Sequence, residues 1–454
     1  MTIVLKPVAI PEFGFPLAQP RVPGAVFETR VRAALTKSGA DWLVVYADRE
    51  HFAAIAFLSG FEPRFEEAFL LLGPGDCRIL LTGNESASYA ALASLPDMDV
   101  RTAQSLSLMG QDRSQSPRLL DMFCEAGIKT GHSVGLVGWK YLEAYEDENR
   151  SDAFFVPAVY VSMLRRAVGP FGTLRDATSD LFHPENGLLA RLDADQIAAS
   201  EWAATRASLA VWRIVSGIRE GDDEFQAAAR MGYAGEHLNV HTMLASASPG
   251  EKVIGLRSAN GRKMSRGDGV TTAVGIVGAL SSRAGLFDEG NDAFLKLATS
   301  YFRGLSVWYD VADVGVTGAT LHGSVTAALA EGNLHSALNP GHLTGFEEWI
   351  HSPIRPGSAE KLASGMLLQV DVIPVPMPGH WALNCEDPVA LADQALRAEL
   401  KQKHPDAYAR IEKRRTFVRD ELGILIKENI LLLSSTPLCL APFWLKSSNL
   451  LTQG

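Results

Sequence analysis

Cysteine is scarce in this chain: only Cys77, Cys124, Cys385 and Cys439 occur among 454 residues. Thiols so few and so scattered do not form the disulfide framework of a small secreted protein, so we expect a reducing compartment, the cytoplasm. Long apolar runs are missing as well, because no stretch of about 18 uninterrupted apolar residues exists, which excludes a membrane-spanning helix. The N-terminus shows no basic stretch followed by an apolar core, so we expect no signal peptide.

An excess of basic residues is also absent. Lys and Arg number 42 against 52 Asp and Glu, which gives a formal net charge of −10. A nucleic-acid-binding surface needs clustered basic residues, so the balance argues against a nucleic-acid partner. The composition, 47% hydrophobic and 21% charged, is typical of a packed globular protein, and 454 residues suffice for two or more domains.

The N-terminal part alternates between helical and strand patterns. A helix is predicted over residues 27–38, and buried apolar runs predict strands at 42–46, 68–72, 78–81 and 134–137. Such alternation favours a three-layer α/β domain, which we place at residues 1–185.

The remaining residues, 186–454, form the second predicted domain. Helices are expected at 196–218, 292–301 and 315–332, and strands at 270–277 and 366–373. Helices before and between long strands predict an α+β domain rather than a doubly wound sheet.

Acidic residues stand in two strand-like segments of this second domain. Asp371 ends an apolar run in which the period of two places it on one face with Gln369. A lone carboxylate there costs several kcal/mol unless it has a partner. The neighbours Glu386 and Asp387 would point to opposite faces of a strand, so one of the two would point inward.

A histidine on a constrained turn is the third candidate. His342 lies between glycines in the segment 339–345 (NPGHLTG), and Glu348 and His351 follow it closely. Clustered titratable groups beside glycines favour a functional site over an isolated core histidine.

Several segments, taken together and in order, resemble one superfamily. They are 39–46 and 58–61 in the first domain, and 221–224 (GDDE), 266–268 (RGD), 341–346 (GHLTGF), 365–371 (GMLLQVD) and 384–387 (NCED) in the second. The chain is similar to the creatinase, aminopeptidase P and prolidase superfamily. The resemblance implies an α/β creatinase-like N-terminal domain and an α+β catalytic domain with the pita-bread fold.

The resemblance also shows what this chain lacks. The metallopeptidases of that superfamily bind two metal ions with two Asp, one His and two Glu. Where the first Asp is expected this chain has Ala273, and the segment 278–285, where the second is expected, has no acid. His342, Asp371 and Glu386 remain, so we expect a divergent member without a two-metal centre, without a bound metal and without another cofactor.

The resemblance to creatinase implies a metal-independent hydrolase that cleaves an amide or amidino-type C–N bond of a small molecule. His342, Asp371 and Glu386 would then be catalytic, and Glu348, His351, Arg257 and Trp381 would bind the substrate. The superfamily also implies a homodimer. Two alternatives stay open: a metal-dependent Xaa-Pro aminopeptidase or dipeptidase with an altered site, and a non-catalytic small-molecule-binding protein on the same fold.

Overall fold

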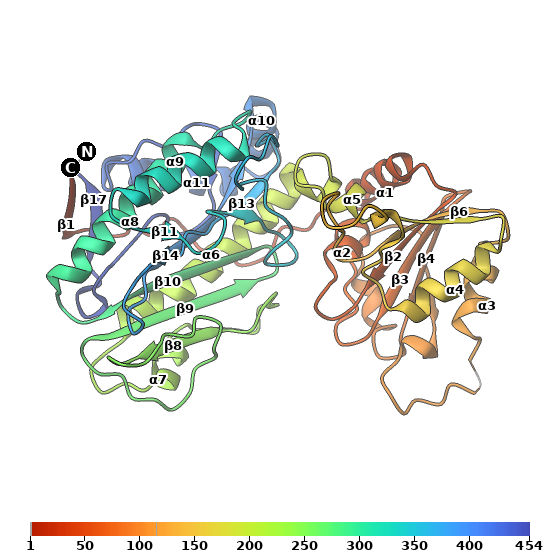
Figure 1. The fold of residues 1–454 in the computed structure, drawn as a ribbon, viewed down its shortest axis with the longest axis horizontal. Coiled ribbons are helices and arrows are strands. Elements are labelled where there is room, and N and C mark those ends of the chain that lie inside the picture. Colours follow the sequence, from red (N-terminus) through yellow and green to blue (C-terminus); the bar gives the residue numbers. More distant parts are fainter. Residues whose placement is uncertain (1, 115) are drawn as a thin grey trace. The chain divides into compact units, whose positions relative to one another are not determined.

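The computed structural model describes residues 2–114 and 116–454 and divides the chain into two compact units (Figure 1). One unit comprises residues 22–190, and the other comprises residues 1–21 together with 191–454. The division differs from the expected one at the N-terminus, because strand β1 (Ile3–Pro7) pairs with the last strand, β17 (Asn449–Gln453). Among the described residues, no helix is both long and apolar enough to cross a membrane.

The unit of residues 22–190 is built on a six-stranded mixed sheet. Its strands, in spatial order, are β5 (Asp99–Thr102), β4 (Cys77–Thr82), β3 (Ala68–Gly73), β2 (Trp42–Ala47), β6 (Ser133–Val137) and β7 (Thr173–Asp176). Its helices are α1 (Gly24–Ser38), α2 (Ala53–Ser59), α3 (Leu119–Ala126), α4 (Ala158–Val168) and α5 (Thr178–Phe182). The strands and the helix predicted from the sequence for this unit are confirmed.

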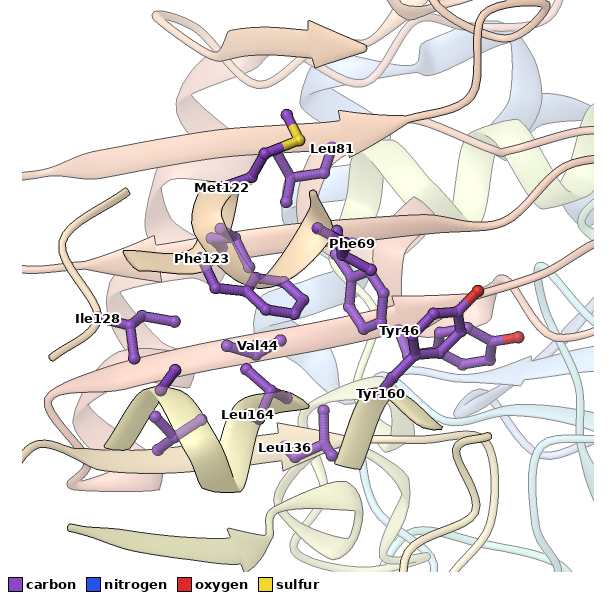
Figure 2. Packing of buried hydrophobic residues seen from close by; sticks show 14 of the residues in the cluster. Val44, Tyr46, Phe69, Leu81, Met122, Phe123, Ile128, Leu136, Tyr160 and Leu164 are labelled. Carbon is purple, nitrogen blue, oxygen red and sulfur yellow. The ribbon is translucent and has the colours of Figure 1, made fainter. Parts of the chain in front are cut away.

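One face of this sheet carries a large apolar core (Figure 2). Val44 of β2 and Phe69 of β3 pack there against Phe123 of α3 and Leu164 of α4, all fully buried. Burial of this size stabilises the unit by about 1.5–3 kcal/mol for each large side chain. The continuous apolar runs of the sequence are therefore strands that are covered on both faces.

The other unit contains a seven-stranded antiparallel sheet. Its strands run in the order β12 (His342–Leu343), β13 (Leu367–Val370), β15 (Asn384–Leu391), β10 (Ala279–Phe287), β9 (Asp268–Ile276) and β8 (Met243–Ala247), with β16 (Ile430–Leu432) also paired to β15. A separate two-stranded sheet joins β11 (His335–Ser336) to β14 (Pro374–Val375).

Six helices of this unit accompany the sheet: α6 (Ala194–Gly217), α7 (Glu224–Ala229), α8 (Asp292–Val311), α9 (Gly318–Ala330), α10 (Gln394–Lys403) and α11 (Pro405–Asp420). Helix α6 begins where the Asp193 side chain accepts the backbone N–H of Gln196. Its many alanines allow a close approach to β9 and β10, against which it packs. The central strands are thereby fixed, and they carry the residues described next.

Candidate active site

Three strands of the antiparallel sheet bring His342, Asp371 and Glu386 together. In the register of β13 and β15, Val370 pairs with Asp387, so the next pair places Asp371, just past the end of β13, opposite Glu386. His342 of β12 pairs with Gln369, two residues from Asp371 and therefore on the same face. One donor atom from each of these three side chains lies within 4.8 Å of the others, and all three residues are buried.

The His342 ring is held on both sides. It stacks on Trp349 with ring centroids 4.0 Å apart, and its Nδ1 lies 3.2 Å from the Leu343 carbonyl oxygen. Its Nε2 lies 3.1 Å from a Glu348 carboxylate oxygen, an ion-pair distance whose angle is not that of a hydrogen bond. Burial alone would lower the pKa of His342, but the Glu348 and Asp371 carboxylates raise it above its ordinary value.

The turn before His342 requires glycine. Gly341 has φ +133°, and a Cβ there would lie 2.8 Å from the Gln369 carbonyl oxygen. A side chain at this position would push β12 away from β13. The glycine therefore keeps the His342 ring beside the two acids.

Both acids of the cluster hold protons more tightly than usual. Burial raises the pKa of Asp371 to about 6, although His342 opposes that shift. Burial, and after it the charges of Asp371 and Glu348, raise the pKa of Glu386 well above its ordinary value. Asp371 is thus ionised above pH about 6, whereas burial and the neighbouring acids favour the protonated form of Glu386.

The hydrogen bonds of the two acids differ. Glu386 accepts a hydrogen bond from Asn384 Nδ2 at 3.2 Å, whereas Asp371 Oδ1 is buried without a hydrogen-bond partner in the described part of the chain. Such a group is costly to bury and is typical of a functional site. Asn384, which the sequence analysis did not assign a role, lies two residues before Glu386, and strand periodicity is the signal that could have indicated it.

The two acids open onto a cavity of about 480 Å³. Glu348 and the rings of Trp349 and Trp381 also line this cavity. The volume suits a small molecule. The structure thus places two of the expected substrate-binding residues, Glu348 and Trp381, at the same cavity as Asp371 and Glu386.

The strands beside Glu386 add no acid to its row of paired residues. Glu386 pairs with Ser282 of β10, and Ser282 pairs with Ala273 of β9. Both Ser282 and Ala273 line the cavity, and the Ser282 hydroxyl accepts a hydrogen bond from Asn384. No carboxylate from β9 or β10 therefore reaches the cluster in this row.

Two other expected substrate-binding residues are engaged elsewhere. Arg257 forms a bidentate ion pair with the buried Glu224, at 2.6 and 2.8 Å. The His351 Nδ1 accepts the Ser352 backbone N–H at 2.8 Å, and His351 forms a β-bridge with Leu343. Neither residue lines the cavity that contains Asp371 and Glu386.

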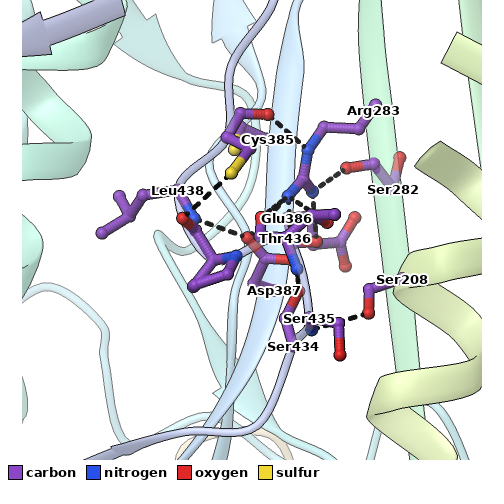
Figure 3. A network of polar contacts seen from close by, with 12 residues as sticks. Ser208, Ser282, Arg283, Cys385, Glu386, Asp387, Ser434, Ser435, Thr436 and Leu438 are labelled. Carbon is purple, nitrogen blue, oxygen red and sulfur yellow. Dashed lines mark hydrogen bonds and ion pairs between the residues drawn. The ribbon is translucent and has the colours of Figure 1, made fainter. Parts of the chain in front are cut away.

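The back of β15 is stabilised by a buried polar network (Figure 3). Arg283 donates to both carboxylate oxygens of Asp387 and to the backbone carbonyl of Glu386. Asp387 also accepts the Leu438 backbone N–H at 3.0 Å. These bonds fix the strand, so the Glu386 side chain is directed to the opposite face, as the alternation of β-strands predicts.

The chain matches known proteins in structure but not in sequence. No protein-family model matches the chain, and no curated protein matches its sequence. Solved structures do match. The prolidase from Pyrococcus horikoshii OT3 is 17% identical, with a TM-score of 0.61, over 80% of this chain and 95% of its own.

Two further structures give the same result. The X-Pro aminopeptidase from Thermotoga maritima MSB8 is 18% identical, with a TM-score of 0.61, over 81% of this chain and 95% of its own. The dipeptidase PepE from Mycobacterium ulcerans is 19% identical, with a TM-score of 0.59, over 82% of this chain and 95% of its own. The mixed α/β architecture expected from the sequence is therefore confirmed, and the chain has the pita-bread fold of these proteins.

Proposed function

We propose that the chain hydrolyses a C–N bond of a small molecule in the 480 Å³ cavity without a pair of metal ions. The observation that carries this proposal is the convergence of His342, Asp371 and Glu386 within 4.8 Å, with the two acids lining the cavity. The names of similar structures, prolidase, X-Pro aminopeptidase and dipeptidase, support C–N hydrolysis as the reaction class.

The two acids differ in the way that acid–base catalysis needs. Asp371, ionised above pH about 6, takes a proton from water as the water oxygen bonds to the substrate carbon. Glu386, whose burial favours the protonated form, gives its proton to the leaving nitrogen as the C–N bond breaks. A proton then passes from Asp371 to Glu386, and this transfer restores both groups.

His342 has a positioning role in this scheme. It is fully buried under Trp349 and does not line the cavity, so it does not reach the substrate directly. Glu348 and Asp371 favour the protonated form of His342, and that form would in turn favour the ionised form of Asp371. The sequence analysis expects His342 to be catalytic; its burial favours an indirect contribution instead.

A single metal ion is the second candidate. Two ions do not fit, because Ala273 and Ser282 supply no carboxylate to the row that contains Glu386. One ion does fit the donor set of His342, Asp371 and Glu386, and the buried, unpartnered Asp371 Oδ1 favours it. Such an ion would supply Lewis-acid activation of water. These three side chains would then hold the ion.

Variants of the two acids test the proposal. Purified protein would be incubated with small amides, amidines and dipeptides, and products would be identified by mass spectrometry. Glu386→Gln should lower kcat at least about 100-fold, because the amide has no proton of suitable acidity to donate. Glu421→Gln, at an exposed position outside the cavity, is the matched control and should keep full activity.

The contrary outcomes are distinct. Full activity of Glu386→Gln would remove the proposed acid and overturn the scheme. Binding of a compound without any product, in the wild type as well, would favour a non-catalytic binding protein on this fold. The homodimer and the cytoplasmic location remain predictions from the sequence.

A further inference from the structure

The ionisable side chains that line the cavity in the described part of the chain are all acidic. Three carboxylates, Glu348, Asp371 and Glu386, line the cavity, whereas none of the described residues that line it is Lys, Arg or His. Most of the remaining lining residues are apolar. A ligand that places an anion here would find no cation in the described lining, and it would face acidic side chains instead.

The most exposed residues of the lining are apolar, whereas two of its acids are buried. Asp371 and Glu386 are only 5% and 7% exposed, whereas the lining residues Leu256 and Leu338 are 75% and 48% exposed. Trp349 and Ile373 are further exposed apolar residues of the lining. The exposed mouth is thus apolar, and Asp371 and Glu386 lie at the buried end of the cavity.

Two arginines that follow lining residues in the sequence are bonded to carboxylates outside the cavity. Leu256 lines the wall, but its neighbour Arg257 is bonded to Glu224 through both terminal nitrogens. Ser282 also lines the wall, and its neighbour Arg283 is bonded to Asp387 on the opposite face of the sheet. Both cations are neutralised by carboxylates outside the cavity, so neither is available to a ligand inside it.

On the basis of the proposed function, we infer that the substrate is an apolar molecule with a cationic or N–H-bearing group at one end and no carboxylate. The acidic end of the cavity would receive the nitrogen group, and the exposed apolar mouth would contact the rest of the molecule. A free dipeptide carries a carboxylate and would need a cation in the wall. The substrate class therefore differs from dipeptides, although similar structures bear the name dipeptidase.

Three matched probes test this specificity without any need for turnover. The Kd values of 2-phenylethylammonium, 2-phenylethanol and phenylacetate would be measured by calorimetry at one pH, in buffer with a chelator. The ammonium should bind at least about tenfold more tightly than phenylacetate, with the alcohol between them. Equal or tighter binding of phenylacetate, or no detectable binding of the ammonium, would overturn the inference.

A charge placed at the mouth sharpens the test. Leu256→Arg should weaken binding of the ammonium and strengthen binding of phenylacetate, so that the ratio of their Kd values falls several-fold. Leu425→Arg is the matched control, because Leu425 is equally exposed, at 75%, but lies outside the cavity; its ratio should not change. If the ratio of the two Kd values were unchanged in Leu256→Arg, Leu256 would not lie at the mouth through which the ligand binds.

Failure of this inference and failure of the proposed hydrolysis give different results. A protein that binds the ammonium selectively but forms no product from any compound would refute hydrolysis and leave the specificity intact. An active protein that prefers carboxylate-bearing compounds would refute the specificity and leave hydrolysis intact.

Discussion

Glu386 and Asp387 are adjacent on β15, and both are buried, yet their surroundings are opposite. Asp387 faces Arg283, whose nitrogen lies 2.8 Å from its carboxylate (Figure 3). Glu386 faces the cavity, where its charged neighbours Asp371 and Glu348 are also acids. Burial raises the pKa of both carboxyls; Arg283 opposes this rise at Asp387, whereas Asp371 adds to it at Glu386.

The difference separates a structural acid from a functional one. A buried carboxylate paired with a guanidinium satisfies its charge and contributes nothing to a reaction. Burial and a neighbouring acid favour the protonated form of a carboxyl, which is able to donate that proton. Strand β15 therefore carries a structural acid, Asp387, on one face and a proposed catalytic acid, Glu386, on the other.

The largest change in stability is expected when the ion pair between Arg283 and Asp387 is broken. Arg283→Met removes the partner of Asp387 and leaves that acid buried without a cation. The free energy of unfolding should fall by about 3–5 kcal/mol, as measured by urea denaturation. Loss of soluble folded protein would agree with this expectation.

The half-buried Arg303 provides the matched control, since it forms an ion pair with the exposed Glu331 at 3.3 Å. Arg303→Met should change the free energy of unfolding by less than about 1 kcal/mol. Equal effects of the two arginine variants would show that the Arg283 network does not stabilise the strand.

Removing the charge of Asp371, which faces the cavity, should instead increase the stability. The pKa of Asp371 in the folded protein is about 6, above its ordinary value of 3.8, so the folded state binds that proton more tightly. The stability of the wild type should therefore fall as the pH rises from about 4 to about 6 and then level off. Asp371→Asn removes this loss and should be more stable than the wild type by about 2–3 kcal/mol at pH 8.

This prediction is checked by measuring, as a function of pH, the difference in free energy of unfolding between Asp371→Asn and the wild type. Below pH 4 the Asp371→Asn variant and the wild type should have nearly equal free energies of unfolding, because Asp371 is then protonated in both states. A variant that is less stable than the wild type at pH 8 would mean that Asp371 is paired like Asp387.

A smaller effect is expected at the turn that places His342 beside the acids. Gly341→Ala puts a Cβ 2.8 Å from the Gln369 carbonyl oxygen at φ +133°, so unfolding should become easier by about 1–3 kcal/mol. Gly345→Ala, where no atom lies within 4 Å of the added Cβ, is the control. Equal thermal unfolding of both variants would argue against a tightly placed His342.

Strong local patterns made much of the fold predictable. The apolar runs at 42–46 and 68–72 are strands, and the capped helix predicted at 196–218 is α6. Strands β8 and β10 were not predicted, because small and polar residues such as Ala279, Ser281 and Ser282 hide their strand pattern. The pairing of β1 with β17 was not predictable either, since it joins the two ends of the sequence.

The site was predictable only in part. The motifs indicated His342, Asp371 and Glu386, and the register of three strands explains why they meet. The partner of Arg257 was not predictable, because Glu224 lies 33 residues away and no local pattern links the two. Side-chain direction in irregular segments depends on tertiary contacts, which the spacing of residues does not encode.

The metal content of active protein tests the central claim most directly. Natively purified protein would be analysed for bound divalent ions per chain, and turnover of its substrate would be measured on the same sample before and after chelation. The account predicts turnover with at most one ion per chain and none required; turnover that is lost on chelation and restored by one ion would support the single-metal candidate. Turnover that appears only with two bound ions per chain would contradict the claim that the chain works without a pair of metal ions.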